Sequence, residues 1–169
     1  MRLRHATLKD IDLLKYWDTK PHVIAAGGEE DWFDWEKELS RAAKWQKFLI
    51  AEINTRPIGI MQIIDPALEH THYWGDVAQN LQAIDIWIGE EADLGLGYGT
   101  QMMELAFQLC FTDPTIKAIL IDPLATNSAA CRFYERLGFK QLETRKFGSD
   151  NCIIYQLTRS DWLERDPPQ

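Results

Sequence analysis

A glycine-rich hexapeptide, Leu94-Gly95-Leu96-Gly97-Tyr98-Gly99, constrains this chain more than any other segment. It follows residues 83–88, whose β-branched and aromatic residues indicate a strand, and precedes residues 100–109, where apolar residues recur at helical spacing. Backbone without side chains lets several N–H groups converge, and the dipole of the following helix favours negative charge there. The segment therefore predicts an anion site and a phosphate-bearing ligand.

Two familiar phosphate-binding motifs fit this loop poorly. A P-loop ends in Gly-Lys-Ser/Thr, whereas Gly99 is followed directly by Thr100. A dinucleotide fingerprint has Gly-x-Gly-x-x-Gly near the start of a βαβ unit, with an acidic residue about 20 positions further on. Here the glycines are spaced Gly-x-Gly-x-Gly deep in the chain, and Asp122 lacks that spacing. The plain alternative is a flexible loop before an ordinary helix.

A second informative block follows the next predicted strand. Pro123 ends that strand, because proline cannot continue a central ladder. Asn127 or Ser128 then caps a helix, and Gly138 ends it as the residue after the C-cap. The last residues of this block, 134–139, read Tyr-Glu-Arg-Leu-Gly-Phe and run into another strand.

Together the two blocks resemble the GNAT N-acetyltransferases over roughly residues 82–158. The acetyl-CoA pyrophosphate loop of that family is usually written Gln/Arg-x-x-Gly-x-Gly/Ala. Gly97 and Gly99 fit this spacing, whereas Leu94 occupies the position of the Gln or Arg. The helix that closes in Tyr-Glu-Arg-Leu-Gly-Phe resembles the last block of the family.

A closer resemblance is to the aminoglycoside 6′-N-acetyltransferases, in which the first position of the loop is also Leu. It is carried by Asp85 nine residues before the loop, by Asp122 followed by proline, by Asn127, and by Tyr134 in Tyr-Glu-x-x-Gly-Phe.

The resemblance implies an α/β (α+β layered) class and the GNAT acyl-CoA N-acyltransferase fold, with a mixed, mostly antiparallel central sheet flanked by helices. It implies one domain over 1–169, in which 1–81 supply mainly acceptor-side elements and 82–158 form the acetyl-CoA-binding core. Apolar periodicity predicts strands at 2–6, 47–53, 57–64, 83–88, 118–121, 139–147 and 151–158, helices at 8–17, 30–44, 100–112 and 127–137, a short last helix capped by Ser160, and irregular segments at 21–28 and 65–81.

Length and cysteine usage narrow the class of protein. A chain of 169 residues can bury a core as one domain without disulfides. The chain has no apolar run long enough to span a bilayer and opens directly into a predicted strand, so we expect a cytoplasmic protein. Cys110, Cys131 and Cys152 form neither a Cys-x-x-Cys pair nor a Cys/His cluster, so we expect them to pack as small hydrophobes and expect no metal.

The distribution of charge indicates the kind of partner. A formal net charge of −8 argues against nucleic acid, which requires a basic surface. Residues 57–116 contain no Lys or Arg but nine acids, so a cleft lined by this stretch would attract polycations. The plain alternative is a solvated acidic face. The nine are Asp65, Glu69, Asp76, Asp85, Glu90, Glu91, Asp93, Glu104 and Asp113.

Acetyl transfer from a thioester to an amine needs a neutral amine, a donor for the developing oxyanion and a proton for the leaving thiolate. Asp85 interrupts an apolar strand, and the resemblance implies that it holds the acceptor ammonium and acts as general base. Tyr134 is the general acid that the resemblance implies. Each has a plain alternative, an outward-facing strand residue for Asp85 and a core tyrosine for Tyr134.

The resemblance also implies binding residues. Trp87 and Ile88 end the strand where family members use a backbone N–H for the thioester carbonyl, and Asn127 would bind the pantetheine arm unless it is only a helix cap. Asp122 would bind substrate amino groups, or it simply starts a turn. Trp74, in an irregular segment, could stack on a sugar or cation. The cofactor-binding residues expected from the loop are Leu94, Gly95, Leu96, Gly97, Tyr98, Gly99 and Thr100.

These observations predict an acetyl-CoA-dependent N-acetyltransferase that acts by direct transfer on a polycationic small molecule, most simply the 6′-amine of an aminoglycoside. Two alternatives stay open. One is another acceptor, such as a siderophore-precursor hydroxylamine, a polyamine or a protein N-terminus, and the other is a non-catalytic CoA-binding sensor. As partners we expect a cationic amine substrate, no nucleic acid and no membrane, with the chain a monomer or weak homodimer.

Overall fold

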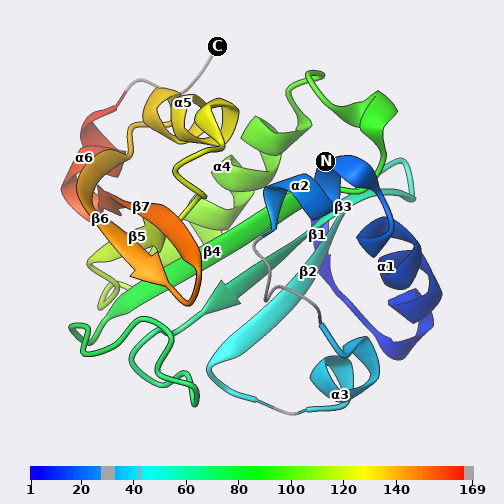
Figure 1. Ribbon diagram of the computed structural model, residues 1–169, viewed down its shortest axis with the longest axis horizontal. Helices are drawn as coiled ribbons and strands as arrows, with labels where there is room; N and C mark the ends of the chain where they lie inside the picture. Colours follow the sequence, from blue (N-terminus) through cyan, green and yellow to red (C-terminus); the bar gives the residue numbers. More distant parts are fainter. Residues whose placement is uncertain (28–32, 42, 166–169) are drawn as a thin grey trace. The chain divides into compact units, whose positions relative to one another are not determined.

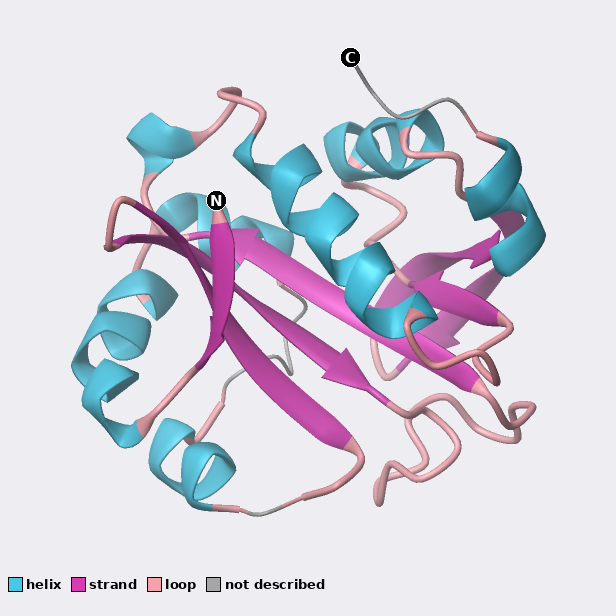
Figure 2. Ribbon diagram, turned by 180° about the vertical axis from the view of Figure 1, so that it is seen from behind, coloured by secondary structure: helices cyan, strands magenta, loops and turns pink. Residues whose placement is uncertain are grey.

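The computed structural model describes residues 1–27, 33–41 and 43–165. Its strands form a sheet of seven in the order β1-β2-β3-β4-β5-β7-β6 (Figures 1 and 2). β4 and β5 run parallel, whereas the pairs β1–β2, β5–β7 and β6–β7 are antiparallel. The predicted class, a mixed and mostly antiparallel sheet accompanied by helices, is confirmed. The strands are β1 (Arg2–His5), β2 (Gln46–Ile53), β3 (Arg56–Ile64), β4 (Leu81–Ile88), β5 (Ala118–Ile121), β6 (Lys140–Phe147) and β7 (Asp150–Thr158).

Helices and short 3₁₀ turns lie in three of the connections between these strands, β1–β2, β4–β5 and β5–β6, and a last helix follows β7 (Figure 2). They are η1 (Leu8–Asp10), α1 (Ile11–Asp18), α2 (Pro21–Ala26), α3 (Trp35–Ser40), η2 (Glu91–Asp93), α4 (Tyr98–Phe111), α5 (Ser128–Arg136) and α6 (Arg159–Glu164).

The chain divides into two compact units. The first unit comprises Met1–Ile63 with Asp85–Leu105, and the second comprises Ile64–Ile84 with Ala106–Gln169. β4 and α4 each begin in one unit and end in the other.

The first unit is built around the β2–β3 hairpin. Its turn consists of Asn54 and Thr55, both with positive φ, as a two-residue turn between twisted strands requires. Leu14 and Trp17 from α1 pack with side chains of α3, β2 and β3, and burial of these apolar groups stabilises the unit. The buried cluster is Leu14, Trp17, Trp35, Phe48, Ile50 and Ile60.

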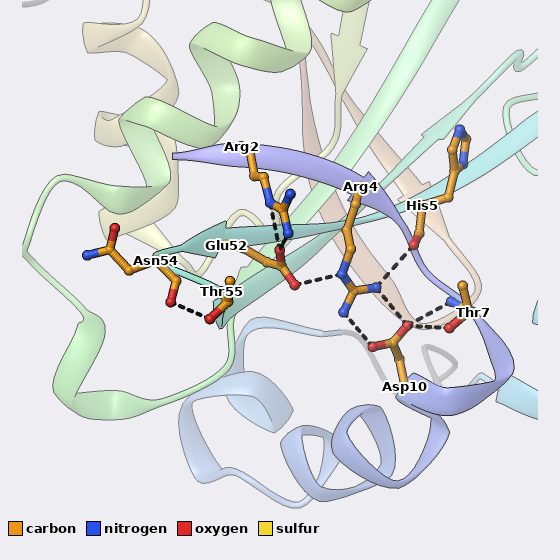
Figure 3. Close-up of polar contacts among 8 residues, drawn as sticks. All are labelled: Arg2, Arg4, His5, Thr7, Asp10, Glu52, Asn54 and Thr55. Atoms are coloured by element: carbon orange, nitrogen blue, oxygen red, sulfur yellow. Dashed lines mark hydrogen bonds and ion pairs between the residues drawn. The ribbon is translucent and has the colours of Figure 1, made fainter.

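A charged network fastens β1 to β2 and to η1 (Figure 3). Arg4 donates from Nε to Glu52 at 2.6 Å and from both terminal nitrogens to Asp10 at 2.7 and 2.8 Å. The Arg4 guanidinium lowers the pKa of Asp10 against the opposing effect of burial, and Thr7 adds hydrogen bonds. Arg4, helped by Arg2, also lowers the pKa of Glu52. Both buried carboxylates therefore stay ionised at neutral pH.

The second unit contains the β5–β7–β6 part of the sheet and α5. Leu81 pairs with Ala118 where β4 runs beside β5. The predicted cap of α5 is confirmed, because Oδ1 of Asn127 accepts from the backbone N–H of Ala130 at 3.1 Å. Gly138, with φ +92°, follows this helix as predicted.

Three predicted elements differ from the structure. Residues 21–28, predicted to be irregular, include α2, because Pro21 is preorganised for the first helical turn. The helix predicted at 30–44 is reduced to α3, capped by Asp34 through the N–H of Lys37, and residues 30–32 and 42 lie outside the described residues. The cap of the last helix is Thr158 rather than Ser160, because the Thr158 hydroxyl accepts from the N–H of Asp161.

Two further sequence expectations concern burial. Cys110, Cys131 and Cys152 are all buried, as expected of cysteines that pack as small hydrophobes. Within the described ranges, none of the helices has the length and apolar character needed to cross a bilayer.

We predict that Arg4→Met lowers the free energy of unfolding by about 3 kcal/mol, because it leaves two buried carboxylates without their shared cation. Urea denaturation at pH 7 measures this loss. Arg2→Met is the matched control, since the Arg2 side chain is 66% exposed and its removal should cost less than about 1 kcal/mol. Equal losses from the two variants would contradict this role of Arg4.

Candidate active site

Asp85 is the one acidic residue of β4, and it faces water. Its neighbours Ala83 and Ile84 are buried, whereas the Asp85 side chain is exposed. Exposure removes the cost of placing a carboxylate in an apolar strand. Asp85 is therefore a charged group that a cationic ligand can reach from solvent.

The strand then ends in a backbone segment that other elements hold in place. The carbonyl of Ile88 accepts from Nε2 of His22 at 2.9 Å, and the N–H of Gly89 donates to Ile58 at 2.9 Å. Since a carbonyl can only accept, Nε2 of His22 carries the proton. The ring of Trp87 lies parallel to Phe33, with centroids 6.1 Å apart.

Close packing fixes the residues just beyond β4. A Cβ on Gly89 would lie 2.0 Å from the indole of Trp17, so no larger residue fits there. The same indole donates from Nε1 to Glu90 at 3.2 Å, and Lys20 pairs with Glu90 at 2.9 Å. Thus α1 and the residues before α2 determine where the chain leaves the strand.

The glycine-rich loop is an exposed turn that leads into α4. Gly95 and Gly97 have φ of +72° and +77°, which L side chains rarely adopt, and apart from the chain neighbours no atom of the described residues lies within 4 Å of a Cβ built on either. These glycines are needed for backbone conformation rather than for packing. The carbonyl of Gly97 accepts from the N–H of Gln101 at 3.1 Å and so starts the helix.

One ion pair anchors this loop at its beginning. Asp93 is buried and accepts both terminal nitrogens of Arg56, at 2.7 and 3.0 Å. Asp93 in turn raises the pKa of Arg56. Because Arg56 begins β3, the pair ties the loop to the β2–β3 hairpin. The glycine turn leads into a 14-residue helix, whose N-terminus is the positive end of its dipole; that this end binds an anion stays a prediction.

In the second unit, Tyr134 lies on the inner side of α5. It is 8% exposed, and its ring packs against Phe133 and Phe139 with centroid distances of 5.1 and 5.8 Å. This packing fixes the orientation of the ring. The side-chain oxygen of Asn127 accepts the hydrogen bond that caps α5. The role of Asn127 in binding a cofactor stays a prediction.

Asp122 follows β5 and accepts a hydrogen bond from the hydroxyl of Tyr73 at 2.7 Å. Trp74, which the sequence singles out as a stacking residue, is only 3% exposed, with its ring against Tyr73 and Phe147. Its burial disfavours direct stacking on a ligand. Tyr73, 43% exposed, is the aromatic side chain of this segment that solvent reaches.

Tyr73 and His22 have no predicted role in the sequence analysis. The sequence singles out Trp74 because it lies in an irregular segment, and sequence alone does not reveal which of the two adjacent rings, Tyr73 or Trp74, is buried. A signal for His22 does exist, since Pro21 before it is a common first residue of a helix. The contact of His22 with Ile88 joins residues 66 positions apart, which no local pattern encodes.

The glycine turn before α4 and the exposed carboxylate of β4 are the features that the sequence predicts for an anionic and a cationic ligand. Comparison with known families gives the class. The chain belongs to the GNAT acetyltransferase family, because the model of the acetyltransferase (GNAT) domain matches residues 6–147. The predicted family resemblance is thereby confirmed.

Individual relatives are similar over almost the whole chain. Aminoglycoside N(6′)-acetyltransferase type 1 of Klebsiella pneumoniae is 29% identical over 171 residues, covering 96% of this chain and 85% of that protein. The structure of aminoglycoside acetyltransferase AAC(6′)-Ib with coenzyme A and kanamycin is 26% identical, with a TM-score of 0.85 and coverage of 95% and 96% of the two chains. A complex of AAC(6′)-Ib with ribostamycin and coenzyme A gives 25% identity, a TM-score of 0.86 and coverage of 96% and 95%.

Proposed function

We propose that this chain transfers the acetyl group of acetyl-CoA to the 6′-amine of an aminoglycoside. The observation that carries the proposal is the end-to-end similarity to aminoglycoside N(6′)-acetyltransferases, in both sequence and fold. The acidic character of residues 57–116, which lack Lys and Arg, supports a polycationic acceptor.

In this proposal the donor binds at the glycine-rich loop. The N–H groups of residues 95–100, at the N-terminus of α4, receive the pyrophosphate, whereas the N–H of Leu94 donates to the carbonyl of Glu91 at 3.1 Å. The backbone of Trp87 and Ile88 supplies a hydrogen-bond donor for the thioester carbonyl, where charge develops in the transition state. The contacts of His22 and Trp17 with residues 88–90 keep this backbone rigid. Asn127 binds the pantetheine arm.

Asp85 receives the acceptor ammonium and removes its proton. An alkyl ammonium titrates near ~10, so little neutral amine is present at pH 7 without a base. Because Asp85 is exposed, a water molecule can relay the proton from the ammonium to the carboxylate when the two groups are not in direct contact. The neutral amine then attacks the carbonyl carbon, forming the C–N bond directly, without an acetyl-enzyme.

Collapse of the tetrahedral adduct breaks the C–S bond. Tyr134 gives its phenolic proton to the leaving thiolate, and the packing of its ring by Phe133 and Phe139 keeps the phenol oriented for that step. The nitrogen loses two protons in all: the one taken up by Asp85 returns to solvent, and the second, lost from the adduct nitrogen, restores the Tyr134 phenol through water, so one proton is released in each turnover. Asp122 binds a second ammonium of the substrate.

An acceptor panel tests the proposal. With acetyl-CoA and a thiol-release assay, we expect turnover of kanamycin- and tobramycin-type aminoglycosides that carry a free 6′-amine. An aminoglycoside with a hydroxyl at that position, spermidine and lysine are the controls and should not be turned over. Turnover of spermidine alone would replace the proposed acceptor by a polyamine. Binding of acetyl-CoA without turnover of any amine would favour a CoA-binding sensor.

Asp85→Asn and Tyr134→Phe test the catalytic roles. We expect Asp85→Asn to lower kcat/KM by about 10²–10⁴-fold, the usual contribution of a positioned base, and Tyr134→Phe to lower kcat. Calorimetry should show unchanged affinity for coenzyme A in both. Asp76→Asn, which makes the same charge change at another exposed residue of the acidic stretch, is the control and should keep full activity. An Asp85→Asn variant with full activity would exclude the role of base.

Gly97→Ala tests the donor loop. The added Cβ strains a backbone with φ +77°, so we expect affinity for coenzyme A to fall by about tenfold, consistent with strain of 1–3 kcal/mol. Calorimetric titration with coenzyme A measures this loss. Gly75→Ala is matched, because Gly75 has φ +66°, has open space around its Cβ position and lies outside the loop. Similar losses in both variants would show that general destabilisation, not the loop, sets the affinity.

A further inference from the structure

The segment between β3 and β4 has a charged centre. Glu69 is 7% exposed, and it accepts from the N–H and hydroxyl of Thr71 at 2.7 and 2.8 Å and from the N–H of Tyr73 at 3.0 Å. Burial raises the pKa of Glu69, but these hydrogen bonds outweigh it and the pKa is lowered overall. The ionised carboxylate therefore fixes the backbone at Tyr73.

The side chain of Tyr73 is fixed as well. Its ring stacks on Phe147 at the end of β6, with centroids 4.2 Å apart and planes within 8° of parallel. The hydroxyl reaches Asp122, just after β5, and donates to Oδ2 at 2.7 Å. Tyr73 thus links three parts of the second unit: its own segment, the end of β5 and the β6–β7 hairpin.

Contacts of the next residue, Trp74, also hold Tyr73 in place. The carbonyl of Trp74 accepts from Arg145 at 2.9 Å, and the Trp74 ring meets Phe147 edge-on with centroids 5.9 Å apart. Arg145 is itself paired with Glu143. Because the backbone, the ring and the following residue are each restrained, the Tyr73 hydroxyl is delivered to Asp122 at little further entropic cost.

We infer that Tyr73 is a positioning residue that orients the Asp122 carboxylate for an ammonium group of the acceptor. This inference rests on the proposed function, in which Asp122 binds that ammonium. A carboxylate has about four acceptor sites, and the Tyr73 hydroxyl takes one of them, which restrains how the Asp122 carboxylate is turned. The hydroxyl donates to the carboxylate, so it does not replace the negative charge that attracts the acceptor.

Tyr73→Phe isolates the hydroxyl, because the ring that stacks on Phe147 is retained. We expect the KM for a 6′-amine aminoglycoside to rise by about three- to tenfold, less than the full loss of a hydrogen bond to a charged group, because the charge of Asp122 is kept and only its orientation is released. The kcat and the KM for acetyl-CoA should be unchanged, which a general loss of structure would not produce. Tyr16→Phe is the matched control, since Tyr16 is also an exposed tyrosine and its hydroxyl accepts a hydrogen bond from Lys20.

A double-mutant cycle with Asp122→Asn distinguishes the inference from the function on which it rests. If Tyr73 acts through Asp122, Tyr73→Phe adds nothing to the KM of Asp122→Asn, and the two effects are far from additive. Additive effects, or a normal KM for Tyr73→Phe beside an impaired Asp122→Asn, would overturn the positioning role alone. A normal KM for Asp122→Asn would remove the proposed role of Asp122 and the inference with it.

Discussion

A carboxylate in the middle of an apolar strand must reach water, and this constraint governs how β4 is built. Residues 81–84 pair and pack within the second unit, whereas Asp85 and the residues after it belong to the first unit. Along β4 the side chains thus change from buried at Ile84 to exposed and charged at Asp85. The fixed backbone at residues 88–90 and the glycine turn follow from where this strand ends.

Local signals in the sequence predict much of this structure. Asn127 and Gly138 mark the ends of α5 through hydrogen bonding and backbone conformation, and Gly97 marks the start of α4 in the same way. The strand at 118–121 is recognised by its continuous apolar residues. Each of these features depends on residues within one or two turns of chain, which is why sequence alone is sufficient.

Contacts between distant residues account for what the sequence does not predict. The helix predicted at 30–44 begins later than predicted, because Asp34 caps it and Trp35 is its first residue. The hydrogen bonds from Tyr73 to Asp122 and from His22 to Ile88 join distant residues, so no helical or strand periodicity predicts them. The two compact units are made of interleaved stretches of chain, which no local pattern encodes. The position of a carboxylate in an apolar strand identifies Asp85 in the sequence as a candidate site residue. The burial of Trp74 and the exposure of Tyr73 depend on tertiary packing, which the sequence does not show.

The pairing of Arg56 with Asp93 has a consequence for how the molecule responds to ionic strength. Residues 94–100 contain no Lys or Arg, and the nearby Arg56 is already neutralised by a buried partner. An anion at this turn would therefore meet backbone dipoles and no cationic side chain from residues 94–100, and such dipoles act only within the first turn of the helix. A cation near exposed carboxylates such as Asp85 would be attracted over a longer distance. The two proposed ligands would thus be attracted over different distances, while a rise in salt concentration weakens both attractions.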